Sequence, residues 1–270
     1  MDILSYKLGK KAGGGGGSSI DWTQIGYAKE PESIQEGFDY AKQIYDNWDA
    51  TQTSLNNKFK NDEDLIYMPL VDTSNNTSLE WAFSNCSALC KLPLIDTSNV
   101  TTFYYTFNNC GALREIPNID TSSATTIESI FNNCYGLKKI PNLNTSNVTN
   151  MTRAFQCCSS LTSVPELDAG KVNSIGSLFT QANNVTNLGG FKDLGKAYLT
   201  TRAEGYSNYR LDLSPCTLLT HDSLMNVINN LYDIGSTGVQ RQQVVLGATN
   251  LAKLTAEEIA IGTDKGWIIS

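Results

Sequence analysis

The stretch DTSNVTTFYYTFNNCGALREIPNI, residues 96 to 119, decides the fold because the segments before and after it follow the same pattern. Five such units run without a gap from Asp72 to Phe191, and each begins with Asp or Asn at a spacing of 24 residues. Self-similarity at a fixed period of roughly 20 to 50 residues is the sequence signature of a repeat architecture. The sequence therefore predicts a solenoid in which successive units stack.

Five positions of the unit are apolar in every copy, namely the eighth, twelfth, eighteenth, twenty-first and twenty-fourth. One unit alone cannot bury these side chains, whereas stacked units bring each column of equivalent residues into contact with its copies above and below. We expect these columns to form the core. The twelfth position is Phe throughout: Phe83, Phe107, Phe131, Phe155 and Phe179.

Within one unit, the apolar pair before each Asp predicts a short strand that ends in a turn, and the spacing between positions eight and twelve predicts a short helical turn. Pro recurs beside the strand, and because Pro cannot donate to a β-ladder, the strand must be very short or irregular. The Asp-Thr-Ser-Asn segments fit Asx turns and helix N-caps. The expected fold class is an α/β repeat solenoid, a right-handed superhelix of leucine-rich-repeat type.

The pattern divides the chain into four regions. The run Gly13 to Gly17 with Ser18 and Ser19 is typical of a flexible tether. Apolar residues at helical spacing from 32 to 48 predict an amphipathic helix that caps the first unit, and a degenerate unit begins at Trp48. The regions are a tether (1–19), an N-terminal capping region (20–47), the repeats (48–191) and a C-terminal cap (192–270).

The C-terminal region alternates strands and helices. Strands are expected near Leu211, near Val244 and from Trp267 to Ile269. A helix is expected after Thr220, and a second helix opens with a capping box of Thr255 and Glu258. We interpret this region as a cap of the same solenoid, with a small separate α/β domain as the alternative.

Composition argues against several function classes. The formal net charge is −7 with a pI of about 4.8, and no long Lys or Arg run offers the footprint that a phosphate backbone requires. No apolar run reaches the roughly 18 residues of a membrane span. The single His leaves almost no general base near neutral pH. We expect no nucleic-acid partner, no membrane insertion, no cofactor and no catalytic residues.

Cysteines occupy one column of the repeat, which ends in Ala182. The favoured interpretation is a ladder of small buried free thiols, with disulfides and a metal site as less favoured alternatives. His221 stands at the start of a predicted helix, and we interpret it as a surface or capping residue. The column comprises Cys86, Cys110, Cys134 and Cys158.

The segments AFSNCSAL (82–89) and AFQCCSSL (154–161), with the variants TFNNCGAL and IFNNCYGL, resemble the BspA-type leucine-rich repeats of bacterial surface proteins. NTSNVTNM (144–151) is similar to the related DUF285 repeat, and the tail from LTHDSLMNVINNLYDI to LGATNLAKLTAEEIA looks like the usual ending of such proteins. The resemblance implies a cell-surface or extracellular protein that binds host or microbial macromolecules. It specifies a fold far better than a ligand, because the repeated residues are the buried ones.

We expect a ligand to bind at columns whose residue type varies between units, since the buried columns that form the scaffold are constant. The ninth and tenth positions differ freely between units and place aromatic residues on adjacent rungs, which is a common anchor for proteins or sugars. A charged strip, with Lys91, Glu115 and Lys139, lies beside the strand. The competing interpretation is that the aromatic residues pack against the scaffold and the charges are merely solvated. The candidate ligand-binding residues are Trp81, Tyr104, Tyr105, Arg114, Lys138 and Arg153.

Two functions are compatible with this pattern. The first is a binding or adhesion module for a protein or glycan, on a bacterial surface or on a phage virion. The virion location is suggested because residues 1 to 19 show no signal-peptide pattern and resemble the start of some phage tail-associated proteins. The alternative is a structural spacer or assembly protein of a phage or prophage tail, attached to a larger assembly through its N-terminus.

Overall fold

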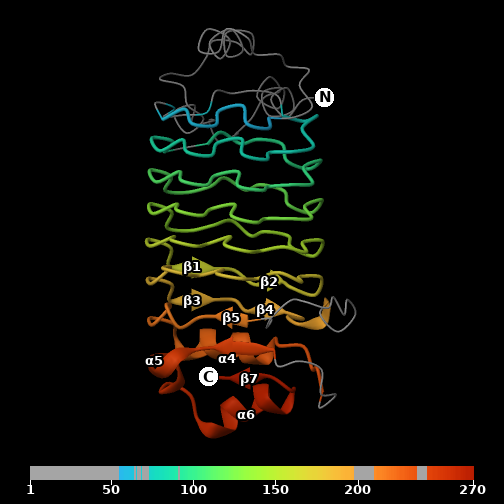
Figure 1. Cartoon of the computed structure of the whole chain (residues 1–270), viewed down its shortest axis with the longest axis vertical. Helices are drawn as coiled ribbons and strands as arrows, with labels where there is room; N and C mark the ends of the chain where they lie inside the picture. Colours follow the sequence, from blue (N-terminus) through green and yellow to red (C-terminus); the bar gives the residue numbers. More distant parts are fainter. Residues whose placement is uncertain are drawn as a thin grey trace, which may run out of the picture.

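The computed structural model places a stack of 24-residue coils above a C-terminal unit of helices and short strands (Figure 1). The tether, the capping helix expected from 32 to 48, Lys91 and residues 198–209 lie outside the described residues. The structure describes residues 55–63, 65, 68, 73–90, 92–197, 210–235 and 242–270.

Successive coils are joined by a parallel ladder of backbone hydrogen bonds. Trp81 N–H donates to the Tyr104 carbonyl at 2.9 Å, and Phe83 N–H donates to the Thr106 carbonyl at 2.9 Å. The same pattern repeats one unit later, where Tyr105 N–H donates to the Glu128 carbonyl. Each coil therefore satisfies part of its backbone through the next coil rather than through itself.

The segment expected to be a short helical turn is instead a run of consecutive turns. Ala82 N–H donates to the Leu79 carbonyl three residues back, while Trp81 N–H points to the neighbouring coil. In an α-helix, the N–H groups beyond the first turn donate to carbonyls four residues back in the same segment. The alternation of internal and intercoil bonds explains why the helical-turn prediction is wrong here.

Within the described repeat region, the strands are very short and lie in the last two coils. β1 (Ser163–Val164) pairs in parallel with β3 (Asn187–Leu188), and β2 (Leu167–Asp168) pairs in parallel with β4 (Phe191–Lys192). Pro165 separates β1 from β2 because its nitrogen has no proton to donate. In the described part of the preceding coil, the position equivalent to Ser163 forms an isolated bridge, Lys139 with Ser163.

The core is a continuous file of buried apolar side chains, and the phenylalanine column runs through it. The ring centroids of consecutive members from Phe59 to Phe179 are 5.2 to 6.2 Å apart, with interplanar angles between 7° and 22°. Each fully buried Phe contributes roughly 1.5 to 3 kcal/mol relative to exposure. Phe191 ends the file with an edge contact to Phe179. The other four apolar columns are also buried, apart from the half-buried Ile140.

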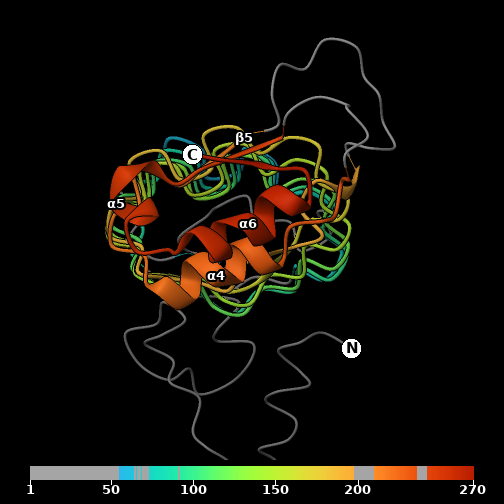
Figure 2. The ribbon, with the colours of Figure 1, turned by 90° about the horizontal axis from the view of Figure 1, so that it is seen from below.

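In the described residues from 210 onwards, the chain forms a parallel three-stranded sheet and three helices. The sheet has the order β5 (Arg210–Asp212), β6 (Gln243–Val245), β7 (Ile268–Ile269). Figure 2, viewed along the stack, shows α4 and α6 crossing the end of the coils. The helices are α4 (His221–Asn229), α5 (Gly247–Leu251) and α6 (Ala256–Asp264).

Both predicted helix starts in this segment are confirmed. The Thr220 hydroxyl accepts from Ser223 N–H at the start of α4, and Thr255 and Glu258 form the reciprocal capping box of α6. The sequence did not indicate α5, which spans only five residues and has no side-chain cap. Leu224, Val227 and Ile228 of α4 are fully buried, and Leu224 and Val227 join the same hydrophobic cluster as the coils.

Among the described helices, none is long and apolar enough to cross a bilayer.

Candidate functional site

The ninth and tenth positions of neighbouring coils form two adjacent columns on one side of the stack, where every member except the fully buried Ser129 is at least partly exposed. The tenth residue has a positive φ in every repeat coil, which is 57° at Trp81 and 54° at Tyr105. This left-handed conformation is uncommon for bulky residues and costs of order 1 to 3 kcal/mol. This conformation points the N–H of the tenth residue toward the next coil. The intercoil hydrogen bond that the N–H then makes offsets the conformational strain. The ladder therefore fixes the backbone beneath both columns.

The structure brings Trp81, Tyr104 and Tyr105 into one aromatic cluster. The Trp81 and Tyr105 rings stack with centroids 4.2 Å apart and an interplanar angle of 22°. The ring centroids of Tyr104 and Tyr105 are 4.6 Å apart, and the two ring planes are tilted by 60°. The ring centroids of Tyr104 and Trp81 are 5.6 Å apart in an edge-to-face arrangement. All three side chains are half-buried, so the cluster is packed but still reaches the surface.

Lys60 completes this cluster and was missed by the sequence analysis. Its Nζ lies 4.2 Å from the Trp81 ring centroid, which is a cation–π distance. Tyr105 already covers one face of Trp81 at the same separation, so the ammonium must lie over the other face. Lys60 occupies the thirteenth position of the preceding unit rather than the ninth or tenth, so comparison within a column could not reveal it.

Carboxylates flank Tyr104 in the ninth column. Glu80 and Glu128 occupy the same position in the coils before and after it. Burial raises the pKa of the Tyr104 phenol, and the negative charge of Glu128 and Glu80 raises it further, while Arg153 lowers it. Asn150 Nδ2 donates to Glu128 Oε2 at 2.7 Å and holds that carboxylate in place.

Arg153 is exposed in the tenth column and lies within electrostatic range of Tyr104. Four of the predicted residues, Trp81, Tyr104, Tyr105 and Arg153, therefore share one surface, which we call the aromatic face together with Lys60, Glu80 and Glu128.

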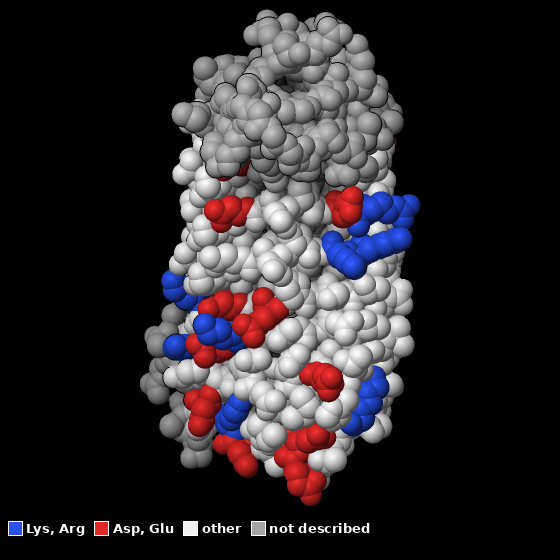
Figure 3. All heavy atoms as spheres, turned by 180° about the vertical axis from the view of Figure 1, so that it is seen from behind, with Lys and Arg blue, Asp and Glu red and all other residues white. Residues whose placement is uncertain are grey.

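Arg114 and Lys138 are exposed at the nineteenth position, on a different stretch of the coil from the aromatic face. They are neighbours along the stack, since Lys138 N–H donates to the Arg114 carbonyl at 3.1 Å. On the side of the molecule drawn in Figure 3, Lys and Arg side chains gather in small groups beside acidic ones. The structure thus separates these two predicted residues from the other four.

The cysteine column consists of free buried thiols, as the favoured interpretation predicted. Each sulfhydryl donates to a carbonyl of the preceding coil, for example Cys86 to Phe59 at 2.9 Å and Cys110 to Phe83 at 3.1 Å. Burial raises the pKa of the Cys86 thiol to about 12 and that of Cys134 well above its ordinary value. Thiols in this state are poor nucleophiles and poor metal ligands. Within the described ranges, no group of three His, Cys, Asp or Glu side chains could hold a metal ion.

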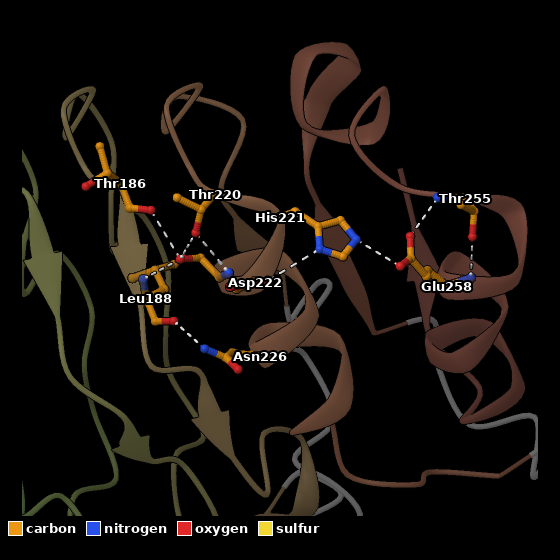
Figure 4. A network of polar contacts seen from close by, with 9 residues as sticks. Thr186, Leu188, Thr220, His221, Asp222, Asn226, Thr255 and Glu258 are labelled. Carbon is orange, nitrogen blue, oxygen red and sulfur yellow. Dashed lines mark hydrogen bonds and ion pairs between the residues drawn. The ribbon is translucent and has the colours of Figure 1, made fainter.

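His221 lies in a polar network that joins the last repeat coil, α4 and α6 (Figure 4). Its Nε2 is 2.8 Å from Glu258 Oε1, and the hydrogen bond to Glu258 raises the pKa of the imidazole. Glu258 Oε2 accepts from Thr255 N–H at 2.8 Å, so one carboxylate serves the capping box and the histidine together.

The same network attaches α4 to the coils. Ser223 Oγ donates to the Thr186 carbonyl at 3.1 Å and accepts from Leu188 N–H at 3.0 Å. Asn226 Nδ2 donates to the Leu188 carbonyl at 3.1 Å. These contacts are those of a structural joint between helix and coil.

Comparison with known families gives a match over the repeat region. The family model described as "Mycoplasma protein of unknown function, DUF285" matches residues 32–135 and 77–191, which together span more than half of the chain. All six predicted binding residues lie within the matched range. A comparison with curated proteins gave no match.

Proposed function

This chain belongs to the DUF285 family, and from that premise we propose that it is a non-enzymatic binding module. In this proposal it is a right-handed, leucine-rich-repeat-like solenoid of the BspA type. It presents its surface to a protein or a glycan, either on a bacterial cell surface or on a virion. The parallel ladder between coils and the buried repeat columns support the solenoid assignment.

The aromatic cluster of Trp81, Tyr104 and Tyr105 is the observation that carries the proposal. Large aromatic side chains are enriched among the residues that dominate binding energy at interfaces. Here the rings are held by mutual packing and by a ladder-fixed backbone, so little side-chain entropy is lost when a partner docks. A rigid and partly exposed aromatic surface suits recognition.

The chemistry of the described residues supports a non-catalytic role. His221 is engaged by Glu258, and the column thiols are protonated at neutral pH because burial raises their pKa. Catalysis requires an acid, a base or a nucleophile that converge on a site for the reacting atoms. The aromatic face instead offers rings, carboxylates and ammonium or guanidinium groups, which are suited to binding.

The test is binding of the purified full chain to an array of bacterial-surface glycans, mucosal glycans and host matrix proteins. The double variant Trp81→Ala/Tyr105→Ala removes the stacked pair, and Tyr135→Ala removes an aromatic side chain that is 52% exposed elsewhere on the stack. We expect saturable binding that is lost in the double variant and retained in Tyr135→Ala. Equal binding by all three proteins would contradict the proposal.

The alternative role as a structural spacer predicts a different result. A spacer would bind no array component, and it would self-associate or attach to virion components through residues 1–47. Cross-linking with and without that segment distinguishes the two functions.

A further inference from the structure

The charges on the aromatic face follow an ordered pattern along the stack. Lys60 stands at one end, Glu80 and Glu128 flank Tyr104 in the middle, and Arg153 stands at the other end. Neighbouring coils in such a ladder are about 4.8 Å apart, so the two glutamates are separated by roughly 10 Å with the phenol between them. The centre of the face is negative and its ends are positive.

The covered faces of Trp81 limit what this surface can hold. Sugar rings bind aromatic residues by stacking on an open ring face. Lys60 covers one face of Trp81 and Tyr105 covers the other. The indole therefore offers only its edge to a ligand, which argues against a carbohydrate stacked on Trp81.

The middle of the face instead carries groups that accept hydrogen bonds from a cation. Tyr104 lies in the negative field of Glu80 and Glu128, which acts on its phenol. Asn150 Nδ2 donates to Oε2 of the half-buried Glu128 and orients its carboxylate. A guanidinium or ammonium group placed here would meet two carboxylates and an aromatic edge, and charge-assisted hydrogen bonds are the stronger ones.

A second copy of this chain centred on Tyr104 does not fit the pattern. A two-fold axis through Tyr104 would place Glu80 against Glu128 and Lys60 against Arg153. Both pairings bring like charges together, and the facing of like charges disfavours an interface.

Building on the proposed function, we propose that the aromatic face binds a protein partner through a basic side chain, Arg or Lys, held between Glu80 and Glu128 over Tyr104. The positive ends of the face then favour acidic residues on either side of that basic residue. The partner is a protein segment with a basic centre and acidic flanks.

The test uses the full chain labelled with ¹⁵N and two probes, the peptide N-acetyl-Gly-Gly-Arg-Gly-Gly amide and its counterpart with citrulline in place of Arg. Citrulline keeps the shape of arginine and removes the charge. We expect saturable shifts of the Trp81 indole and of the Tyr104 and Glu128 amides with the arginine peptide, and none with the citrulline peptide. Binding of both peptides with equal affinity would overturn the proposal.

Two charge-matched double variants separate a specific site from general attraction to an acidic protein. Glu80→Gln/Glu128→Gln should weaken binding of the arginine peptide roughly tenfold. Glu115→Gln/Glu166→Gln removes the same number of charges from exposed positions elsewhere and should leave binding unchanged. Equal weakening in both variants would overturn the proposal.

The outcome also separates this inference from the proposed function. A glycan on the array that binds the wild type and is lost in Trp81→Ala/Tyr105→Ala would preserve the binding function and refute the basic partner.

Discussion

Glu258 accepts from Thr255 N–H with one oxygen and lies 2.8 Å from His221 Nε2 with the other, so a single carboxylate ties the start of α6 to the start of α4 (Figure 4). Asp222 adds a weaker contact at 3.6 Å from His221 Nδ1. The C-terminal segment is thus joined across two helices by groups that titrate.

The stability of this joint should depend on pH. The hydrogen bond to Glu258 raises the pKa of His221 from its ordinary 6.5. The stabilisation of the folded state by protonated His221 is therefore complete below pH 6.5 and is lost as pH rises through the raised pKa. The hydrogen bond from Thr255 N–H has the larger effect on Glu258, and together with the hydrogen bond from His221 it lowers the pKa of Glu258 from 4.5. The stabilisation of the folded state by ionised Glu258 is therefore lost as pH falls through the lowered pKa. Between pH 6 and pH 8, urea midpoints should fall more for the wild type than for His221→Gln. Parallel curves for the two proteins would refute the coupling.

The centre of the phenylalanine file should be intolerant of truncation. Phe131 is fully buried and stacks on Phe107 and Phe155, so Phe131→Ala leaves a cavity between two rings. We expect a loss of about 3 to 5 kcal/mol in the free energy of unfolding, measured by urea denaturation. Phe131→Leu retains most of the volume and should lose clearly less. Similar losses for both variants would mean that volume does not control stability at this position.

The cysteine column should resist alkylation in the native protein. The thiols of Cys110, Cys134 and Cys158 are buried and their pKa values are well above 9.0, so few thiolates form and reagents cannot reach them. Maleimide labelling at pH 7 followed by mass spectrometry should find these three unmodified until urea unfolds the chain. The half-buried Cys157 is the internal comparison and should react before these three. Native labelling of Cys134 as fast as Cys157 would contradict the buried column.

Glycine at the tenth position should stabilise the stack where the side chain contributes no packing. Ser177 is exposed with a φ of 57°, a conformation that costs an L-residue roughly 1 kcal/mol and glycine nothing. Ser177→Gly should therefore raise the free energy of unfolding by up to about 1 kcal/mol. Asn183→Gly, at an exposed residue without positive φ, should lower it instead. Destabilisation by both substitutions would show that the turn is not strained at Ser177.

The sequence indicated the buried columns and the helix caps because these depend on spacing and residue type alone. The apolar positions were visible as strict columns, and the Thr255–Glu258 box is a local motif. The helical turn was not predicted correctly. The segment alternates hydrogen bonds within itself with hydrogen bonds to the next coil, and a local sequence pattern contains no information about the next coil.

The candidate surface was predicted only in part for a related reason. Trp81, Tyr104 and Tyr105 lie in adjacent columns and could be recognised together. Lys60 belongs to another column and contacts Trp81 because its side chain is long. A contact of this kind depends on the three-dimensional packing and not on the position within the unit. The nineteenth position, which holds Arg114 and Lys138, varies between units as a binding position would. In the structure, however, this position lies on a different stretch of the coil from the aromatic face.

The ladder between coils makes the 24-residue unit interchangeable. Tyr105 N–H donates to the Glu128 carbonyl, and the equivalent Ser129 N–H donates to the Thr152 carbonyl one unit later. Excision of residues 120–143 would present the Thr152 carbonyl to Tyr105 in the same register and shorten the stack by about 4.8 Å. Recombination between units can thus lengthen or shorten such a protein in whole steps, and each step reshuffles the surface residues without breaking the scaffold.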